Sequence, residues 1–373
     1  MIYLDLDDTL FSTSHLKAFL KTNEGRRYLA ENISNYETPI YKELEEIIKN
    51  FEVTILTDSP EIYARAILDK HRLYLPLIAN AKKPFVNLNI DSNSLIIGDS
   101  AKDILTGHKL RIPNIGVTWG YSTENKLKQA EATRIADTPK KLVEIVDEWS
   151  SGKIDYLPRQ KTKSYTLIPK KEWGTPKPNI EIIALGEYHK WVPGQRHENS
   201  TKILDFKSMK DISMKNIREG EHSKFFHDGQ MQKGREYFDV YNEFSKNLKT
   251  VLGCLEESTL LAAPNSLPYF CYKTDINKKI IAEISEKTSH KIPEFRTVYR
   301  VYPKRESHEG TRNLEIQLAT LGIKNCDVST DRIAIFDDVV TSGNQMEAIA
   351  RLLRYAGFSG KMTAIALGRN TAD

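Results

Sequence analysis

The chain has 373 residues, of which 40% are hydrophobic, and it carries a formal net charge of +4 with a pI of about 8.6. This length and composition are enough for about two globular domains with proper cores. No apolar run approaches a membrane span, and the mild charge does not by itself indicate nucleic-acid binding. Cys254, Cys271 and Cys326 lie far apart, which argues against a disulfide framework or a zinc ribbon.

The first predicted strand, residues 2–6, leads into a group of acids. It is apolar apart from Asp5, and Asp7, Asp8 and Thr9 follow it. If Asp5 and Asp7 lie around the strand end, one carboxylate can attack phosphorus while the other donates and later removes a proton. A structural role as helix caps does not account for this pair. The chain shows no signal-peptide pattern at this end, so we expect a cytoplasmic location.

Three further segments follow in an order that makes chance unlikely: residues 53–57, 82–84 and 95–103. The first and third are predicted strands that end on Thr57 and Asp99. Phosphoryl transfer needs positive charge around the phosphoryl oxygens, which a lysine and Mg²⁺ can supply. Lys83 is a candidate for this role, although it or Lys82 could equally be a solvated surface charge. Asp99 and Asp103 have an alternative reading as a helix N-cap and a first-turn acid.

Together these four segments resemble the haloacid dehalogenase-like phosphatase superfamily over about residues 1–148. The resemblance implies that Asp5 is the nucleophile and Asp7 the general acid and base. It also implies that Thr57 donates a hydrogen bond to the phosphoryl oxygens, which Lys83 neutralises. Mg²⁺ would be bound by Asp5, Asp99 and the main-chain oxygen of Asp7, with Asp103 in support. We therefore predict a phosphatase domain over residues 1–150.

Substrate choice in such a domain depends on the insert between the first two motifs, about residues 11–38. This insert is short, and residues 15–20 and 26–31 predict one or two small helices. They are too little to make a closed lid by themselves. The site is then either open, which suits a bulky phosphorylated substrate, or capped by the second domain.

Residues 151–178 are rich in basic residues and are interrupted by Pro158, Pro169, Pro176 and Pro178. We interpret them first as an exposed linker between domains. The alternative is a strip that contacts nucleic-acid phosphates. Nucleic acid is therefore a partner that the sequence allows but does not favour.

The second predicted domain, residues 179–373, begins with a strand over residues 180–185, and a long helix is predicted over residues 234–252. Residues 260–266 predict a strand and turn whose backbone N–H groups could receive pyrophosphate. An ordinary strand-to-loop turn is nearly as good an interpretation. A later polar stretch could close over pyrophosphate as a mobile loop, through Arg300, Lys304, Arg305 and Arg312. His222 and His227 are not convincing metal ligands.

The last motif, residues 333–344, is an apolar strand that runs into two acids and a hydroxyl-rich turn. Backbone N–H groups with the Thr341 and Ser342 hydroxyls can surround a 5′-phosphate at the start of a helix predicted over residues 345–355. Gly343 allows the backbone a close approach. Asp337 and Asp338 are predicted to hold two ribose hydroxyls at the strand end. The alternative is a strand end with an ordinary helix N-cap.

This stretch resembles the signature of type I phosphoribosyltransferases, with Ser342 where a second threonine is usual. The order of elements from residue 188 to residue 369 resembles the competence-associated ComF-like branch, although this chain lacks the cysteine-rich zinc module of that branch. The resemblance implies that phosphoribosyl diphosphate (PRPP) is bound along the signature turn, by Asp337, Asp338, Val339, Val340, Thr341, Ser342, Gly343 and Asn344.

We therefore predict an α/β protein with two domains, each a parallel-sheet, Rossmann-like fold. The predicted function is bifunctional: a Mg²⁺-dependent phosphatase acting on a phosphorylated small molecule or nucleotide, fused to a PRPP-binding transferase in base or nucleotide salvage. Two alternatives remain open. The second domain could be a sensor that regulates the phosphatase, or the chain could be an accessory that removes terminal phosphates from nucleic acid. No membrane association is expected, and the sequence is compatible with an oligomer.

Overall fold

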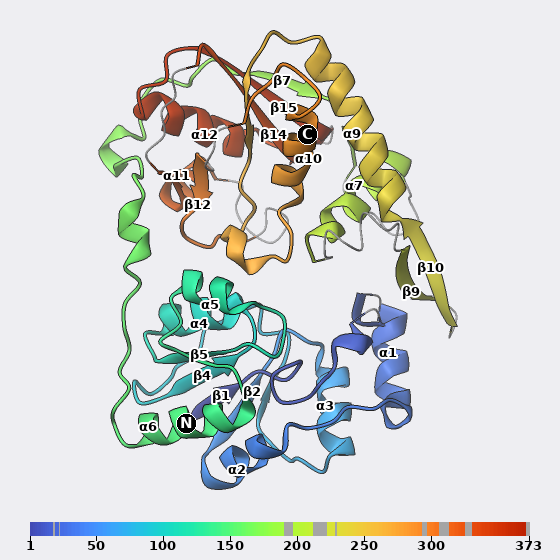
Figure 1. Ribbon diagram of the computed structural model, residues 1–373, viewed down its shortest axis with the longest axis vertical. Helices are drawn as coiled ribbons and strands as arrows, with labels where there is room; N and C mark the ends of the chain where they lie inside the picture. Colours follow the sequence, from blue (N-terminus) through green and yellow to red (C-terminus); the bar gives the residue numbers. More distant parts are fainter. Residues whose placement is uncertain are drawn as a thin grey trace. The chain divides into compact units, whose positions relative to one another are not determined.

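The computed structural model describes residues 1–17, 19–21, 23–189, 197–211, 222–227, 230–292, 297–305, 313–324 and 330–370. The chain divides into two compact units (Figure 1). The N-terminal unit consists of Met1–Lys161 with Ser223–Gly234, and the C-terminal unit of Thr162–His222 with Arg235–Asp373. Among the described residues, no helix is both long and apolar enough to cross a membrane.

A six-stranded parallel sheet is the centre of the N-terminal unit, in the order β3-β2-β1-β4-β5-β6. Its strands are β1 (Ile2–Leu4), β2 (Val53–Leu56), β3 (Leu77–Ile78), β4 (Leu95–Gly98), β5 (Asn114–Val117) and β6 (Arg134–Ala136). β1 lies between β2 and β4, and Leu4 is in register with Ile55 and Ile97. Because these strands are covered on both faces, β1, β2, β4 and β5 are buried along their whole length, as parallel strands usually are.

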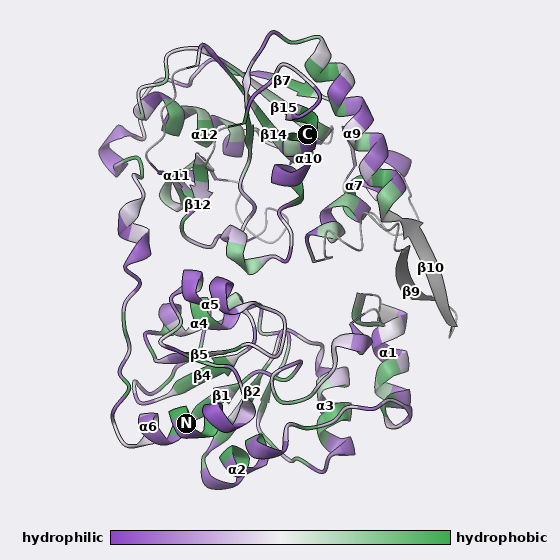
Figure 2. Cartoon of the chain, viewed as in Figure 1, coloured by the Kyte–Doolittle hydropathy of each residue, from purple (hydrophilic) through white to green (hydrophobic). Residues whose placement is uncertain are grey.

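Helices cover both faces of this sheet: α1 (Asn23–Asn32), α2 (Lys42–Asn50), α3 (Glu61–Lys70), α4 (Ala101–Leu110), α5 (Glu124–Ala130) and α6 (Pro139–Ser150). Alternate strand residues separate the two faces. Ile2 and Leu4 belong to the larger core with residues of α1, α2, α3 and α6, whereas Tyr3 faces a smaller one. Figure 1 shows α4 and α5 on the face opposite α6, and in Figure 2 the strongest apolar colouring follows the strands.

The insert after the first strand is small, as its length predicts. It holds the 3-10 turns η1 (Ser14–Leu16), η2 (Phe19–Lys21) and η3 (Ile33–Asn35) around the single α-helix α1. α1 packs against α3, and Leu29 is fully buried in the larger core. The insert is therefore anchored to the side of the sheet rather than forming a separate domain.

The C-terminal unit is built on a second parallel sheet, in the order β11-β14-β15-β7, with β8 also pairing with β15. Its strands are β7 (Glu181–Ala184), β8 (Glu187–Tyr188), β11 (Thr259–Ala262), β14 (Arg332–Val340) and β15 (Lys361–Asn370). Two smaller pairs complete the strands: β9 (His222–His227) with β10 (Gln230–Glu236), and the antiparallel pair β12 (Val298–Arg300) with β13 (Leu321–Ile323). Both main sheets are parallel and helix-covered, which confirms the predicted α/β fold class.

Two cores lie on opposite faces of the second sheet. On one face, α11 (Leu314–Thr320) and α12 (Asn344–Tyr355) pack against Ile333 and Ile335 of β14. On the other, α7 (Glu198–Ser208), α9 (Tyr237–Gly253) and α10 (Ile276–Ser285) pack against Ala334 and Phe336. The remaining elements are the 3-10 turns η4 (Lys161–Ser164), η5 (Lys170–Glu172), η6 (Met209–Asp211) and η7 (Tyr269–Cys271). Successive side chains of β14 therefore face opposite sides of the sheet, and this separates its two adjacent acids, Asp337 and Asp338.

Most of the basic stretch of residues 151–178 is exposed, but a few of its residues pack on one unit or the other. Its first part packs on the N-terminal unit, where Ile154 is buried and Arg159 lies 3.5 Å from Glu131. Its second part packs on the C-terminal unit, where Ile168 is buried and Trp173 contacts the same core. The apolar residues between the lysines decide this outcome, because each can be buried against the nearer unit.

The long helix predicted over residues 234–252 is α9, which begins at Tyr237 because residues 230–236 form β10. Lys, Gln and Arg in that segment are compatible with either a strand or a helix, so residue propensities do not show where the helix begins. His222 and His227 lie on β9, and their side chains are outside the described residues, as is Arg312.

Candidate functional site

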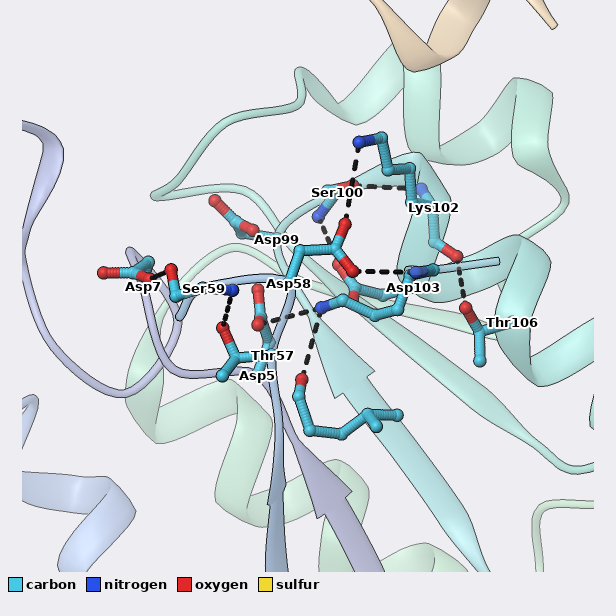
Figure 3. Close-up of polar contacts among 12 residues, drawn as sticks. Asp5, Asp7, Thr57, Asp58, Ser59, Asp99, Ser100, Lys102, Asp103 and Thr106 are labelled. Atoms are coloured by element: carbon cyan, nitrogen blue, oxygen red, sulfur yellow. Dashed lines mark hydrogen bonds and ion pairs between the residues drawn. The ribbon is translucent and has the colours of Figure 1, made fainter. Parts of the chain in front are cut away.

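The predicted acids of the N-terminal unit converge at one edge of its sheet (Figure 3). Asp5 directly follows β1, Thr57 follows β2 and Asp99 follows β4. These three strands are neighbours and parallel, so their carboxyl ends lie at the same edge. Asp5, Asp99 and Thr57 are all buried. The fold thus brings together residues that are up to 94 positions apart in the chain, the difference between 99 and 5.

Lys83 is the cation of this group. Its ammonium lies 2.8 Å from Asp5 Oδ1 and also contacts Asp103 Oδ1. Burial disfavours the charge on Lys83, but the carboxylates of Asp103 and Asp5 hold its pKa well above the usual range. Burial in turn raises the pKa of Asp5, against the influence of Lys83. The alternative of a solvated surface lysine is therefore wrong for Lys83, whose side chain is buried.

Asp7 is held by three hydroxyl groups. Thr13 Oγ1 and Tyr63 OH donate to Asp7 Oδ1 at 2.7 and 2.8 Å. Ser59 Oγ donates to Asp7 Oδ2 at 2.5 Å (Figure 3). These donors come from the insert, from α3 and from the loop after β2. Three donors on one carboxylate fix its orientation beside the Asp5 loop.

Asp99 and Asp103 are placed by the start of α4. Ser100 caps this helix, and Asp103 Oδ2 accepts from the Ser100 N–H at 3.0 Å in a capping box. Both oxygens of Asp103 thus have partners within the protein, Ser100 and Lys83. Asp99 Oδ2 accepts from the Tyr121 N–H at 2.6 Å. Ser100 rather than Asp99 is the N-cap, so that alternative is wrong for Asp99. The alternative of a first-turn acid holds for Asp103 as a local fact, but its contact with Lys83 also makes it part of the site.

The donor set fits a divalent cation that prefers oxygen ligands. Asp5, Asp99 and Asp103 each offer a carboxylate oxygen, and these oxygens lie within 4.8 Å of one another. Burial and the Asp103 carboxylate raise the pKa of Asp99 to about 7. A bound cation would relieve the repulsion between the Asp99 and Asp103 carboxylates. Glycines make room for the acids: a Cβ at Gly120 would overlap the Asp99 carboxyl group, and one at Gly98 would overlap Asp103.

Thr57 and its neighbour Asp58 complete the edge. Thr57 Oγ1 accepts from the Ser59 N–H at 3.1 Å, which leaves the hydroxyl hydrogen available for a ligand. Asp58 Oδ1 accepts from the Lys83 N–H at 2.7 Å and so fixes the loop that carries this lysine. Asp58 was not among the predicted residues, although its place beside Thr57 could have indicated it.

The signature turn of the C-terminal unit lines a small cavity of about 40 Å³ that is partly open to solvent. Its walls come from the end of β14 and the start of α12, together with Gln317 of α11: Asp337, Val339, Val340, Thr341, Ser342, Gly343, Asn344, Gln345 and Met346. Gly343 has φ 73°, the left-handed conformation that glycine adopts without strain, and α12 begins directly after it. A helix N-terminus opening into a cavity is suited to an anion.

Asp337 and Asp338 lie on different faces of β14. Asp337 lines the cavity, and its Oδ2 accepts from Gln345 Nε2 at 3.2 Å. Asp338 instead lies near two ammonium groups, those of Lys207 at 3.3 Å and Lys210 at 3.5 Å. The strand continues to Val340, so neither acid is at the strand end as predicted. Of the two acids, Asp337 lines this cavity and Asp338 faces the lysines.

The two acids also differ in pKa. Burial and the adjacent Asp338 carboxylate raise the pKa of Asp337 to about 8. Burial acts in the same direction on Asp338, but Lys207 and Lys210 outweigh it and hold the Asp338 pKa far below its usual range. At neutral pH the pair thus carries its negative charge on Asp338, opposite the lysines.

Arg300 and Lys304 do not belong to an open, mobile loop. Arg300 ends β12 and is 3% exposed; its guanidinium donates to the Asn265 carbonyl, Thr320 Oγ1, Gln317 Oε1 and Gln345 Oε1. Lys304 is also buried, with its N–H bonded to the Ser266 carbonyl. Side-chain amides that accept from the guanidinium stabilise its burial, which the polar sequence around it does not reveal.

No family model matches this chain, and no curated protein matches it at a significant level. Several solved structures do match. A predicted phosphatase from Clostridium acetobutylicum is 19% identical, with a TM-score of 0.32. A haloacid dehalogenase-like family hydrolase from Streptococcus pneumoniae and a hydrolase from Pseudomonas syringae are each 17% identical, with TM-scores of 0.30. Each match covers 39% of this chain and 97% of the other. Likeness at this level carries no argument for function, which must come from the residues.

Several residues of the first site escaped prediction: Thr13, Lys17, Ser59, Tyr63, Lys102 and Tyr121. Each contacts a predicted residue, or the residue directly after one, from another part of the chain. Tyr63, for example, lies on α3 and reads as an ordinary apolar-face residue of that helix. The pairing of such residues with Asp7 or Asp99 depends on loop geometry, for which the sequence has no motif.

Proposed function

We propose that the N-terminal unit is a Mg²⁺-dependent phosphomonoester hydrolase that works through an aspartyl-phosphate. The observation that carries this proposal is the buried group of Asp5 and Asp99 at the ends of two adjacent strands, with the Lys83 ammonium paired to Asp5 and with Asp7 held beside it by three hydroxyl groups. Asp7 is suited to proton transfer because fixed donors orient its carboxyl group. Asp5 is suited to attack on an anionic phosphoryl group because it is paired with the buried ammonium of Lys83.

In the first step, an Asp5 carboxylate oxygen attacks phosphorus, and the ester oxygen leaves with a proton from Asp7. In the second, Asp7 removes a proton from water, which attacks the aspartyl-phosphate and releases inorganic phosphate and free Asp5. Lys83 neutralises the phosphoryl oxygens, and the Thr57 hydroxyl donates to one of them. Asp5, Asp99 and the main-chain oxygen of Asp7 would hold Mg²⁺, with Asp103 in support. When bound, the ion supplies positive charge for the phosphoryl group.

Phosphate release from a panel of phosphate monoesters, with and without Mg²⁺, tests this proposal. Wild-type protein should release phosphate in a Mg²⁺-dependent way, and Asp5→Asn should not. The Asp91→Asn variant is the matched control, because Asp91 is an exposed acid in the loop before β4. Release that persists in Asp5→Asn would contradict the proposal.

A second candidate function concerns the C-terminal unit. We propose that its cavity binds PRPP, with the 5′-phosphate at the N-terminus of α12 and Asp337 on a ribose hydroxyl. The cavity lined by Thr341, Ser342 and Gly343 supports this reading, and the phosphoribosyltransferase activity expected from the motif rests on it. In that reaction a nucleophile would displace pyrophosphate from the ribose, and the nucleotide product could then be a substrate for the phosphatase.

Pyrophosphate release distinguishes an enzyme from a sensor at this cavity. A transferase consumes PRPP and releases pyrophosphate, whereas a sensor binds PRPP without consuming it. Thr341→Val with Ser342→Ala should weaken PRPP binding measured by calorimetry, because both hydroxyl groups are lost. Wild-type protein that does not bind PRPP at all would contradict both versions. Binding to 5′-phosphorylated oligonucleotides that weakens with salt would favour the nucleic-acid alternative instead.

A further inference from the structure

We propose that Lys17 and Lys102 form a cationic rim that binds a second anionic group on the phosphatase substrate. The substrate class is then a phosphate monoester of a small molecule that carries another carboxylate or phosphate. This inference rests on the proposed phosphatase function and specifies its substrate. The two lysines come from different elements, the insert and the first turn of α4.

Lys17 is placed by Asp8, the residue after the predicted general acid. Its ammonium lies 2.5 Å from Asp8 Oδ2, while the Thr13 N–H and Ser14 Oγ donate to the same carboxylate at 2.9 and 2.7 Å. Asp8 therefore fastens the start of the insert to the loop that carries Asp5 and Asp7. Asp8 itself is in the left-handed region with φ 54°, which aspartate tolerates better than most residues.

The Lys17 ammonium also lies 5.4 Å from the centre of the Tyr121 ring. The Tyr121 N–H is the group that holds Asp99, so Lys17 is beside the cation-binding acids of the site. Burial opposes its charge, but Asp8, Asp99 and Asp7 together raise the Lys17 pKa. Lys17 therefore stays charged at neutral pH, with 38% of its side chain exposed.

Lys102 is the corresponding cation next to β2. Its ammonium lies 3.6 Å from Asp58 Oδ2, and its N–H is bonded to Ser100 Oγ at 3.0 Å (Figure 3). Asp58 follows Thr57 and also holds the Lys83 backbone. Both partners of this ion pair are 37% exposed. Each lysine thus pairs with an acid that directly follows a predicted catalytic residue, Asp7 in one case and Thr57 in the other.

The rim lysines differ from Lys83 in what they are free to do. Lys83 is buried and forms ion pairs with Asp5 and Asp103, so its position suits contact with the transferred phosphoryl group. An exposed ion pair such as Lys102–Asp58 contributes about 0–1 kcal/mol, so an incoming anion can replace the aspartate at little cost. The site is otherwise rich in carboxylates, which would repel a polyanionic substrate. Two ammonium groups at its edge would attract the second anionic group of such a substrate.

The test compares kcat/KM, in the presence of Mg²⁺, for three esters that differ in their second group. Glycerol 3-phosphate has no second anion, 3-phosphoglycerate has a carboxylate and fructose 1,6-bisphosphate has a second phosphate. We expect wild-type protein to prefer at least one of the last two over glycerol 3-phosphate. Lys17→Met and Lys102→Met should each lower that preference about tenfold, the effect of losing one charge-assisted hydrogen bond.

Conservative and remote variants show whether charge or folding is responsible. Lys17→Arg and Lys102→Arg keep a cation and should keep most of the preference. Lys141→Met removes a lysine that is paired with Glu144 at 2.9 Å on the surface of α6, and it should change neither kcat/KM nor the preference. Unchanged thermal unfolding of the Met variants checks that the insert remains folded.

Two results would overturn the inference, and they can be told apart. If glycerol 3-phosphate is hydrolysed by an Asp5-dependent reaction but the preference is absent or unchanged in both Met variants, the rim is wrong and the phosphatase stands. If wild-type protein hydrolyses none of the three esters or the wider panel, the phosphatase proposal fails and the rim with it.

Discussion

Asp7 shows how much of this site depends on single hydrogen bonds. Its two oxygens accept from Thr13, Ser59 and Tyr63, so the carboxyl group has one orientation. The Tyr63 hydroxyl is held to this carboxylate in a buried setting, which raises the Tyr63 pKa strongly and keeps it a donor. A carboxylate so fixed can exchange a proton with a leaving group without having to be ordered first.

Asp7→Asn tests the role of this group as general acid and base. Asparagine is close in size but cannot donate and retrieve the proton, so kcat should fall by about 10²–10⁴-fold. Steady-state phosphate release measures this, with Asp91→Asn as control. An ester whose leaving group needs no protonation, such as p-nitrophenyl phosphate, should lose less in the first step. A kcat within a few-fold of wild type on every ester would exclude Asp7 from proton transfer.

Gly120→Ala tests whether the space around Asp99 is required. The added Cβ would overlap the Asp99 carboxyl group, so the acid or the backbone must move. Mg²⁺ affinity, measured by calorimetry, should weaken markedly. The control is Gly174→Ala, since nothing lies within 4 Å of a Cβ placed there. Equal Mg²⁺ affinity in the two variants would show that Asp99 does not need its present position.

The sequence predicts the residues that would take part in the chemistry, but it does not predict the residues that hold them in place. Asp5 and Asp99 lie together because each directly follows a strand of one parallel sheet, a relation that strand prediction makes visible, and the loop that carries Lys83 brings its ammonium to Asp5. Tyr63 and Lys17 are brought in by helix placement and by one aspartate in a left-handed turn. Neither arrangement has a signal in residue type or spacing.

At the scale of elements, β14 carries the main electrostatic feature of the C-terminal unit. Two successive acids on one strand point to different faces, where one meets an amide and the other two lysines. The charges were readable from the sequence. The separation of the two acids onto different faces was not readable, because it depends on Lys207. This lysine lies on α7, more than a hundred residues earlier in the chain.

The raised pKa of Asp337 predicts a pH dependence of stability. Its folded pKa of about 8 exceeds the ordinary value, so the folded state holds a proton that the unfolded state releases. Stability should therefore fall as pH rises from about 4 to about 8, by at most about 1.4 kcal/mol per pH unit for this group. Above about pH 5 Asp338 is charged in both the folded and the unfolded state, so it adds little to the slope there.

Urea unfolding of wild type and Asp337→Asn at several pH values isolates this contribution. The variant should gain stability relative to wild type as pH rises through the window, because it has no proton to lose. The free-energy difference between the two proteins is the quantity to follow, since other titrating groups cancel in it. A difference that does not change between pH 5 and pH 8 would contradict the assignment.

The network around Arg300 links three elements beneath the cavity. Its guanidinium donates to side chains of α11 and α12 and to the backbone after β11. Arg300→Met would leave several buried acceptors without a donor, and each such group costs about 1–3 kcal/mol. The free energy of unfolding should fall by about 2 kcal/mol or more. Arg305→Met is the control because Arg305 is exposed, and equal stability of the two variants would disprove the structural role.

Most elements of both sheets could be predicted from apolar runs, but their ends could not. The predicted strand at residues 180–185 is β7, Glu181–Ala184, and the helix predicted at 345–355 is α12, Asn344–Tyr355. The pair β9 and β10 was missed, because its polar sequence has no alternation to mark it. The exposed basic stretch of residues 151–178 packs on each unit through its few apolar residues, a detail that its many charges do not reveal.

At the scale of the whole molecule, two compact units each carry one set of motif residues. The first motifs lie in the N-terminal unit and the signature turn in the C-terminal unit. Phosphate chemistry is the common theme of both proposals, since one site would hydrolyse a phosphate ester and the other would bind a ribose phosphate. A chain with both sites is suited to substrates that share that chemistry.

The central claim is that Asp5 forms a covalent bond to phosphorus. The most direct test is to mix full-length protein and Mg²⁺ with a radiolabelled substrate found in the ester panel, to quench the reaction with acid, and to locate the label in peptides. The account predicts label on the peptide containing Asp5 in wild type and none in Asp5→Asn. Rapid phosphate release with no label at Asp5, or with label elsewhere, would contradict it.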